Sequence, residues 1–368
     1  MNKQLDDVYN KILEYEKKQD VLPGVKWMKY MQQITEWSSP LKVEISLTAN
    51  CNQHCVHCSQ GGHLDSGFFE ERFIDEILKM QPGYVVLTGG EPLLHPNIKT
   101  IIRRFKERGC YIKICTNGSL IEKLSDKNIF LNMDKFDVIQ ISFDASDKDT
   151  YNRIRRGNFF EQVIRGVKFL KEKYPNILVE LHCVPTQQNI IQIEEIYSIA
   201  CGLDVDYFSL APLAPIGNAK YIAGMDTDSL VYLHLRLLER NQKEKVRYIG
   251  CPYEMASLYG KISSEHNYHE QEYSCMAGYS TLYIDWNGDV FPCVYMKNKA
   301  FYLGHLSQGC KEILSNIKKR IQRFYVLENE PCSTCYLWGK CTGGCIGIAY
   351  SITGVCQPGY DPRCALKS

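Results

Sequence analysis

The sequence predicts an α/β fold built on a parallel sheet, followed by a second, cysteine-rich domain. Short apolar runs alternate with stretches of helical periodicity from about Leu41 to Glu239. These runs are mostly apolar on both faces, as the strands of a parallel sheet are when helices cover it. After about residue 245 the helical periodicity fades, and ten of the seventeen cysteines lie from Cys251 onward. The first part is therefore expected to form a doubly wound sheet or a partial barrel.

Six segments of the first part are expected to be strands, because they are short and rich in Val, Ile and Tyr. They are LKVEISLT (41–48), YVVLT (84–88), YIKICT (111–116), VIQISFD (138–144), ILVELHCV (177–184) and VDYFSLAPL (205–213). Amphipathic helices are expected between them. Their apolar stripes include Ile98, Ile101, Ile102 and Phe105, and then Phe160, Val163, Ile164, Val167 and Leu170. A hairpin is expected in TLYIDWNGDVFPC (281–293).

These patterns divide the chain into three parts. Residues 1–40 are charged with a helical pattern and are expected to form a helical extension. Residues 41–245 contain the alternating strands and helices, and residues 246–368 contain the cysteine-rich domain. Each boundary falls where the hydrophobic period changes.

Composition excludes several classes of protein. Forty-three basic against forty-two acidic residues leave almost no net charge, which argues against nucleic acid as a partner. No apolar run approaches the length of a membrane span, and the charged first twenty residues are not a signal peptide. We therefore expect a cytoplasmic protein. Disulfides are rare in that compartment, so tight cysteine clusters point to metal.

Three cysteines, Cys51, Cys55 and Cys58, lie within the eight residues CNQHCVHC, directly after the first expected strand. Active sites of α/β sheets and barrels form on loops at the carboxyl ends of strands. Three buried cysteines or half a zinc site would also fit the spacing, but a structural zinc usually has four protein ligands. Three thiolates on a four-iron cluster leave one iron open to an external ligand. The open iron would then explain why the motif has three cysteines and not four.

This C-x3-C-x2-C motif after the first strand resembles the signature of radical S-adenosylmethionine (SAM) enzymes. The resemblance implies a partial (β/α)6 TIM-like barrel and a 4Fe-4S cluster whose open iron chelates the methionine part of SAM. In that family one electron cleaves SAM to a 5′-deoxyadenosyl radical, which abstracts hydrogen from the substrate. A flavodoxin or ferredoxin is the electron donor that the resemblance implies.

Other positions resemble SAM-binding positions of the same family. TGGEP follows the second strand, TNG follows the third, and Ser142 and Arg153 match positions that bind the SAM carboxylate. A hydroxyl and a guanidinium suit a carboxylate, and His57 takes the family's aromatic position beside the adenine. Simpler explanations are a plain turn for the glycines and a surface cation for Arg153. The residues expected to bind SAM are His57, Gly89, Gly90, Glu91, Asn117, Ser142 and Arg153.

The C-terminal cysteines resemble the SPASM domain of radical SAM enzymes. Cys275, Gly288 and Cys293 are separated by twelve and four residues, and CSTCYLWGKCTGGC (332–345) gives C-x2-C-x5-C-x3-C. The resemblance implies two auxiliary 4Fe-4S clusters. The outer one would be bound by Cys332, Cys335, Cys341 and Cys364, and the inner one by Cys275, Cys293 and Cys345. A pair of zinc knuckles is the alternative, since zinc and iron–sulfur clusters both favour tetrahedral thiolates.

The fourth ligand of the inner cluster is the weakest assignment. Cys251 is the candidate, but twenty-three residues separate it from Cys275. If Cys251 is not a ligand, the inner cluster has an open iron that substrate could reach. Cys356 competes with Cys364 for the outer cluster, and the Asp-Pro-x-Cys context favours Cys364.

The resemblance points to a peptide or protein substrate, since SPASM enzymes typically act on these. Auxiliary clusters can accept an electron from a substrate radical, which gives a crosslinked or oxidised peptide, as in the maturation of ribosomally made peptides (RiPP biosynthesis). Anaerobic sulfatase maturation ranks lower, because Val294 stands where those enzymes carry an aspartate. Asp285 and Asp289 lie nearby on the expected hairpin, whose facing the sequence leaves open.

Three alternatives remain for the function. Forty residues before the first strand are too few for the leader-binding domain of many relatives, so either a separate leader-peptide-binding protein delivers the peptide or the substrate is small. A sugar, cofactor or tetrapyrrole is the small-molecule alternative. An electron carrier would not need Glu91, Ser142 and Arg153, which disfavours a non-enzymatic role.

Overall fold

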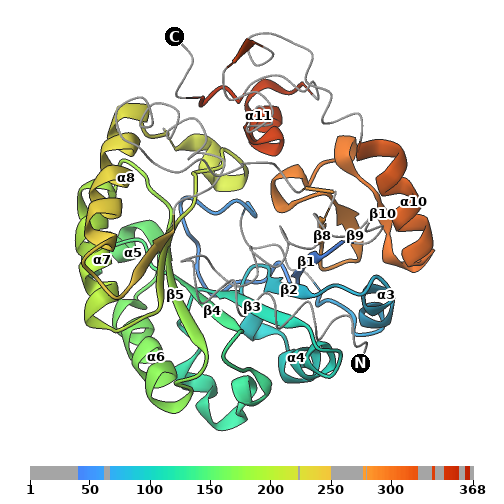
Figure 1. The fold of residues 1–368 in the computed structure, drawn as a ribbon, viewed down its shortest axis with the longest axis horizontal. Helices are drawn as coiled ribbons and strands as arrows, with labels where there is room; N and C mark the ends of the chain where they lie inside the picture. The colour runs from blue at the N-terminus through green and yellow to red at the C-terminus, as the bar shows by residue number, and fades with distance from the viewer. Residues whose placement is uncertain are drawn as a thin grey trace.

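The computed structural model describes residues 40–61, 67–222, 224–249, 277–278, 280–321, 334–335, 344–355 and 361–364. The predicted helical extension over residues 1–40 lies almost wholly outside these ranges. Within them, ten strands form one sheet in the order β10-β9-β8-β1-β2-β3-β4-β5-β6-β7. Figure 1 shows this sheet curving around a central space, with helices α3 to α8 on its outer side. The predicted partial barrel of alternating strands and helices is confirmed.

The strands that build the barrel are parallel to their neighbours. They are β1 (Lys42–Ser46), β2 (Tyr84–Thr88), β3 (Tyr111–Thr116), β4 (Val138–Ser142), β5 (Leu178–Cys183), β6 (Tyr207–Leu210) and β7 (Arg247–Ile249). All six predicted strands are present, and the short β7 was not predicted. Its three residues are too few for a hydrophobic period to stand out.

The predicted hairpin at 281–293 consists of β8 (Thr281–Ile284) and β9 (Asp289–Phe291), followed by β10 (Gly304–His305). β8 and β9 pair antiparallel, as expected for a hairpin, but β8 also pairs in parallel with β1. Residues beyond the predicted boundary near 245 thus extend the sheet of the barrel. A strand pair of this kind leaves no local sequence signal, because it joins residues 42–45 to the distant residues 281–284.

Helices cover the outer face of the sheet. They are α3 (Phe73–Lys79), α4 (Ile98–Lys106), α5 (Lys148–Arg155), α6 (Phe160–Lys173), α7 (Ile193–Gly202) and α8 (Thr227–Asn241). The C-terminal region adds α10 (Cys310–Ile321) and α11 (Ile346–Thr353). Asp147 and Asp226 cap α5 and α8 by accepting hydrogen bonds from backbone N–H groups of the first turn. No helix of the described residues is both long and apolar enough to cross a membrane.

The apolar core lies between the sheet and these helices. The predicted stripe of α4 is buried throughout, and α6 buries Phe160, Val163, Val167 and Leu170, with Ile164 packed at the edge. Outward-facing strand residues such as Val43, Ile112 and Ile139 join this core. The inner face of the strands is different from the prediction, because it is polar.

The inner face carries Glu44 on β1, Cys115 on β3, Gln140 on β4 and His182 on β5, all of which line one pocket. Successive strand residues point to opposite faces, so these positions alternate with the apolar ones. The strands were expected to be apolar on both faces, and that expectation is wrong for the inner one. A pocket that opens into the barrel lets polar side chains there meet solvent or ligand.

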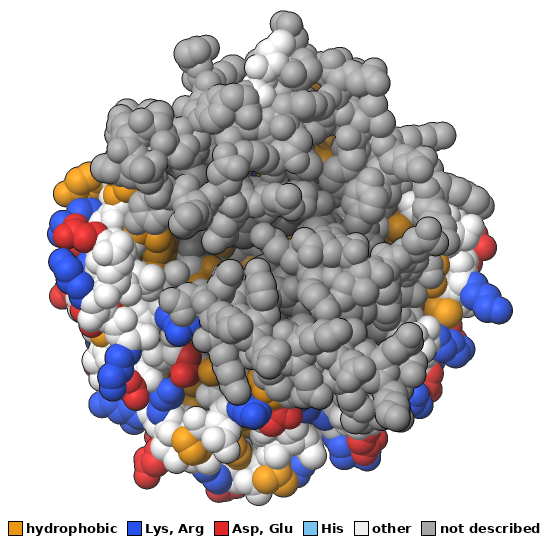
Figure 2. Space-filling model, viewed as in Figure 1, with side chains coloured by type: hydrophobic (Ala, Val, Ile, Leu, Met, Phe, Trp, Pro, Cys, Tyr) orange, Lys and Arg blue, Asp and Glu red, His pale blue; other side chains and the backbone are white. Residues whose placement is uncertain are grey.

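The described surface mixes both signs of charge. On the face shown in Figure 2, Lys and Arg side chains alternate with Asp and Glu side chains along the rim of the described residues. This pattern is in keeping with the nearly equal numbers of basic and acidic residues in the whole chain.

Candidate active site

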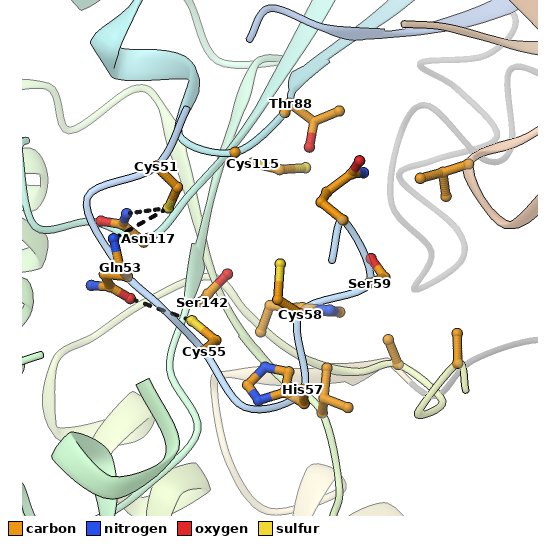
Figure 3. A pocket seen from close by; sticks show the side chains of 18 of the residues that line it. Cys51, Gln53, Cys55, His57, Cys58, Ser59, Thr88, Cys115, Asn117 and Ser142 are labelled. Carbon is orange, nitrogen blue, oxygen red and sulfur yellow. Dashed lines mark hydrogen bonds between the residues drawn. The ribbon is translucent and has the colours of Figure 1, made fainter. Parts of the chain in front are cut away.

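A pocket opens at the carboxyl ends of the parallel strands. Its lining includes the three cysteines of the loop after β1 and Asn117 after β3. Figure 3 shows Cys51, Cys55 and Cys58 around one opening, with Asn117 beside Cys51 and Ser142 at the end of β4. The structure therefore brings together segments that lie far apart in the sequence, from Glu44 to Tyr295.

Backbone hydrogen bonds hold the cysteine loop from two sides. Val56 N donates to the carbonyl of Ile154 on α5 at 2.9 Å. On the other side, Asn218 donates its backbone N–H to Cys58 O at 2.9 Å and its side-chain amide to Cys55 O at 3.1 Å. The loop is thus fixed between α5 and the short 3-10 helix η5 (Gly217–Tyr221). Ligands held by backbone in this way are preorganised for a metal centre.

The chemistry of the three thiols fits an iron–sulfur cluster. Burial raises the pKa of Cys51 to about 12, and it raises the pKa of Cys55 as well. Such thiols become thiolates only when a cation displaces their protons. Within the described ranges, no three His, Cys, Asp or Glu side chains converge as one metal ion requires. A four-iron cluster takes each cysteine on a different iron, so it needs no such convergence.

Gly89 and Gly90 lie against the backbone that leads into the cysteine loop. Gly90 N donates to Thr48 O at 2.7 Å, and Glu91 N donates to Asn50 O at 2.8 Å. A Cβ atom at Gly89, where φ is +138°, would lie 2.3 Å from Thr48 O. A Cβ atom at Gly90 would lie 2.2 Å from Asn50 O. Only glycine allows this approach, and both glycines line the pocket as expected.

The substitution Gly90→Ala is expected to push the cysteine loop out of position. Its Cβ would collide with backbone atoms, which cannot rotate away, so a loss of about 1–3 kcal/mol in stability is expected. Iron retained after reconstitution and SAM affinity should both fall. Gly202→Ala is the matched control, since a Cβ atom there meets nothing within 4 Å. Equal iron content and SAM affinity in both variants would contradict this role for Gly90.

Glu91, which was predicted to bind SAM, is enclosed by neighbouring backbone and side-chain donors. Its carboxylate is fully buried and accepts hydrogen bonds from Leu93 N at 3.0 Å, Thr116 Oγ1 at 2.7 Å and Asn117 N at 2.7 Å. Burial raises its pKa to about 7, although these hydrogen bonds act in the opposite direction. Glu91 is not among the residues that line the pocket. In the structure it holds the turn after β3 in place, and so acts on the site through Asn117.

Asn117 connects that turn to the cysteine loop. Its side-chain amide donates to Asn52 Oδ1 at 2.8 Å and lies 3.8 Å from Cys51 Sγ. Its Oδ1 accepts hydrogen bonds from the backbone N–H and the hydroxyl of Ser119. Asn117 and Ser142, both of which were predicted to bind SAM, line the pocket.

The structure places a different arginine at the site from the one predicted. Arg153 donates to Thr150 Oγ1 at 3.1 Å within α5 and does not line the pocket. Arg155 lines it, is 6% exposed, pairs with Asp144 and has Nη1 3.6 Å from Cys55 Sγ. The sequence did contain the signal. Tyr151, Ile154 and Arg155 fall on the buried face of α5, whereas Arg153 falls on the other face.

His57 and Asp144 form an ion-pair group with Arg155. His57 Nε2 lies 3.3 Å from Asp144 Oδ2, and the His57 side chain is 8% exposed. Burial lowers the pKa of His57. Burial would raise the pKa of Asp144, but Arg155 and His57 outweigh it and keep that carboxylate ionised. His57, which was predicted to bind SAM, lines the pocket, while Asp144, which the sequence analysis missed, orients both His57 and Arg155.

Four of the eight predicted auxiliary ligands lie in the described ranges, namely Cys293, Cys335, Cys345 and Cys364. The other four, Cys251, Cys275, Cys332 and Cys341, lie outside the described residues, as does Cys356.

Asp361 connects two of the described ligands. Its Oδ2 accepts a hydrogen bond from Cys345 N at 3.1 Å, and its carbonyl accepts one from Cys364 N at 2.9 Å. Arg363 pairs with the same carboxylate at 2.7 Å. This gives the Asp-Pro-x-Cys context of Cys364 a physical reason.

Cys293 brings the C-terminal region to the pocket. It precedes the 3-10 helix η6 (Val294–Met296), and both Val294 and Tyr295 line the same pocket as the cysteine loop. Asp285, whose facing the sequence left open, is 5% exposed and pairs with Lys297 Nζ at 2.7 Å. Asp289 instead accepts a hydrogen bond from the side-chain amide of Asn287. Neither aspartate is among the residues that line the pocket.

Comparison with known proteins identifies the family. The model of the radical SAM superfamily matches residues 45–199, and that of the SPASM iron–sulfur cluster-binding domain matches residues 275–336. The AdoMet-dependent heme synthase of Methanosarcina barkeri is 23% identical over 344 residues, which cover 86% of this chain and 94% of that protein. The mycofactocin maturase MftC of Mycobacterium tuberculosis is 28% identical over 340 residues, covering 89% and 83%.

Solved structures share the fold. SuiB of Streptococcus suis bound to S-adenosylmethionine superposes with a TM-score of 0.74 at 19% identity, covering 97% of this chain and 88% of that one. The protein anSMEcpe with bound AdoMet gives a TM-score of 0.66 at 18% identity, covering 88% and 94%. These matches agree with the cysteine loop, the glycine pair and the C-terminal cysteines found above. The chain is a radical SAM enzyme with a C-terminal SPASM domain, and SAM and 4Fe-4S clusters are its cofactors.

Proposed function

We propose that this enzyme abstracts hydrogen from a residue of a peptide and converts the peptide to a crosslinked or oxidised product. The observation behind this proposal is that one pocket is lined both by the SAM-cluster cysteines and by residues next to a predicted auxiliary-cluster ligand. The SAM-cluster cysteines line this pocket, and so do Val294 and Tyr295, which directly follow Cys293. A substrate in this pocket would lie between the site of radical formation and an auxiliary cluster.

The residues of the pocket have distinct roles in this proposal. Cys51, Cys55 and Cys58 hold the SAM cluster, and Gly90 lets its backbone approach the SAM ammonium group. Ser142 and Arg155 offer a hydroxyl and a guanidinium to the SAM carboxylate. When bound, SAM supplies the hydrogen-abstracting radical and the auxiliary clusters accept an electron.

Two auxiliary clusters are proposed, with the ligand sets given by the SPASM resemblance. Cys293 and Cys345 belong to the inner set, and Cys335 and Cys364 to the outer one. Asp361 connects Cys345 to Cys364 by accepting a hydrogen bond from Cys345 N at its carboxylate and one from Cys364 N at its carbonyl, which would fix the two sets relative to each other. Cys251 remains the proposed fourth ligand of the inner cluster.

Relatives support a peptide substrate, and one supports a different class. The MftC relative is named a mycofactocin maturase, and SuiB was solved bound to its precursor peptide SuiA. The heme synthase relative instead favours a small molecule of the tetrapyrrole class as the second candidate. Sulfatase maturation is disfavoured, because Val294 places an apolar group in the pocket where an aspartate would be needed. A flavodoxin or ferredoxin donor, a separate leader-peptide-binding protein and a cytoplasmic location complete the proposal.

Anaerobic turnover by the reconstituted enzyme tests the proposed substrate class. Short peptides encoded beside the gene are incubated with SAM and a reductant, and a tetrapyrrole is tested in parallel. We expect SAM-dependent loss of the mass of two hydrogen atoms from a peptide, as a crosslink or an oxidation requires. Turnover of the tetrapyrrole without any change in the peptides would overturn the proposal and favour the second candidate.

Metal content tests the number of clusters. Iron, labile sulfide and zinc are measured per chain after anaerobic purification and reconstitution. Three four-iron clusters predict about twelve irons and little zinc. About four irons together with one or two zincs would keep the SAM cluster but make the C-terminal region a structural zinc module, and the oxidative mechanism would then be lost.

A further inference from the structure

A chain of hydrogen bonds lies inside the barrel beneath the pocket and is not used by the SAM site. It joins Lys113 on β3, Glu180 on β5, Ser209 on β6 and His182 on β5. Lys113 Nζ pairs with Glu180 Oε2 at 2.7 Å, and Ser209 Oγ donates to Glu180 Oε1. His182 Nδ1 lies 2.7 Å from Ser209 Oγ. His182 is the member of this chain that reaches the pocket.

Glu180 is ionised at the centre of this group. Its side chain is only 1% exposed, and burial by itself would raise its pKa. Lys113 outweighs that effect, with help from the other groups, so the pKa of Glu180 lies below its ordinary value. Gln140 Nε2 also donates to Glu180 Oε1, at 2.6 Å. A carboxylate with these partners can only accept hydrogen bonds.

The network fixes the tautomer of His182. A serine hydroxyl has one proton, and Ser209 gives it to Glu180. Therefore the short contact between Ser209 Oγ and His182 Nδ1 requires Nδ1 to be the donor. Nε2 is then left with its lone pair, and no described residue hydrogen-bonds it. The imidazole is 21% exposed, and the pocket is the space that it faces.

His182 is also uncharged at neutral pH. Burial lowers its pKa to about 4. Glu180 on its own strand and Asp144 after β4 act to raise the pKa, whereas Lys113 on β3 and Arg155 on α5 act to lower it. The barrel thus presents a neutral imidazole with a free acceptor nitrogen to whatever occupies the pocket.

We propose that His182 is the proton acceptor for the substrate, an inference that rests on the proposed function. In that reaction a substrate C–H bond breaks and its hydrogen atom goes to the 5′-deoxyadenosyl radical. The carbon radical loses one electron to an auxiliary cluster, and a substrate N–H, O–H or S–H group bonds to that carbon or forms a double bond to it. The proton released from that group goes to His182 Nε2.

The same network suits His182 for this task. An oxidised, cationic intermediate is a strong acid, so a weakly basic imidazole can deprotonate it without being protonated beforehand. The imidazolium that results would lie 4.0 Å from the Glu180 carboxylate, which stabilises its charge. Ser209 and Glu180 are positioning residues, because they act through His182 and do not face the substrate.

The variant His182→Gln tests the proposal on the substrate that the wild-type enzyme converts. Product formation should fall about a hundredfold, in line with the loss of a general base. Transfer of deuterium from a labelled substrate to 5′-deoxyadenosine should persist, because hydrogen abstraction precedes the proton step. The acid limb of the wild-type pH profile for product formation should disappear. His234→Gln is the control, since His234 is also a buried histidine but does not line the pocket.

Ser209→Ala is a second variant. It leaves His182 in place and removes only the hydroxyl that requires the His182 proton to be on Nδ1. It should lower product formation less than His182→Gln does and shift the acid limb. Iron content and thermal unfolding of each variant establish that it is folded. Loss of deuterium transfer together with product in His182→Gln, or an unchanged pH profile, would assign His182 to binding of SAM or substrate and overturn the proposal. If the wild-type enzyme converts only a tetrapyrrole, the proposed function fails. Product formation from the tetrapyrrole by the same variants then tests the role of His182 separately.

Discussion

Replacement of Cys51, Cys55 or Cys58 by alanine is expected to abolish formation of 5′-deoxyadenosine. Each cysteine lines the pocket and is proposed to supply one thiolate to the SAM cluster, from a loop that α5 and η5 hold in place. Reductive cleavage of SAM needs that cluster, so the loss should exceed a hundredfold. Anaerobic assays of 5′-deoxyadenosine by liquid chromatography measure it directly.

Iron content separates loss of one cluster from loss of the fold. The triple variant should fall from about twelve to about eight irons per chain, because the auxiliary clusters use other cysteines. Cys110→Ala is the matched control, since Cys110 is buried and donates to Pro82 O far from the pocket lining. Continued SAM cleavage by the triple variant would refute the assignment of this loop.

The second large effect is expected from Arg155→Gln. Asp144 is fully buried, and Arg155 and His57 are the groups that keep it ionised. Removal of one partner from a buried ion pair typically costs about 3–5 kcal/mol, because it leaves a charge without compensation. The change also removes the guanidinium next to Cys55, so SAM affinity and SAM cleavage should both collapse. Thermal unfolding and equilibrium binding of SAM measure the two losses.

Arg153→Gln is the control for this variant, two residues away on the same helix. Arg153 bonds only within α5 in the described structure and does not line the pocket, so a change within about 0.5 kcal/mol is expected. The double variant Arg155→Gln, Asp144→Asn should recover part of the stability, because it removes the uncompensated charge as well. A stronger effect of Arg153→Gln than of Arg155→Gln on SAM binding would restore the original sequence prediction.

The local features of this protein can be predicted from the sequence alone. Strand-length apolar runs gave the order of β1 to β6, and the spacings within 51–58 and 332–345 indicated the metal chemistry. Both kinds of signal lie within a few residues of each other along the chain. The covalent spacing of ligands and the period of a strand or helix are local quantities, so they can be read without knowledge of the rest of the fold.

Which side chains meet depends on how the whole chain folds. Arg155 rather than Arg153 reaches the pocket because Arg155 is on the buried side of α5. Glu91 is enclosed by the turn after β3, and β8 adds to β1 by a pairing of distant segments. His182 gains its tautomer from Ser209 and Glu180, which three strands of the sheet bring together with Lys113. The direction of a side chain and its partners depend on how strands register and helices pack, and a single element does not contain that information.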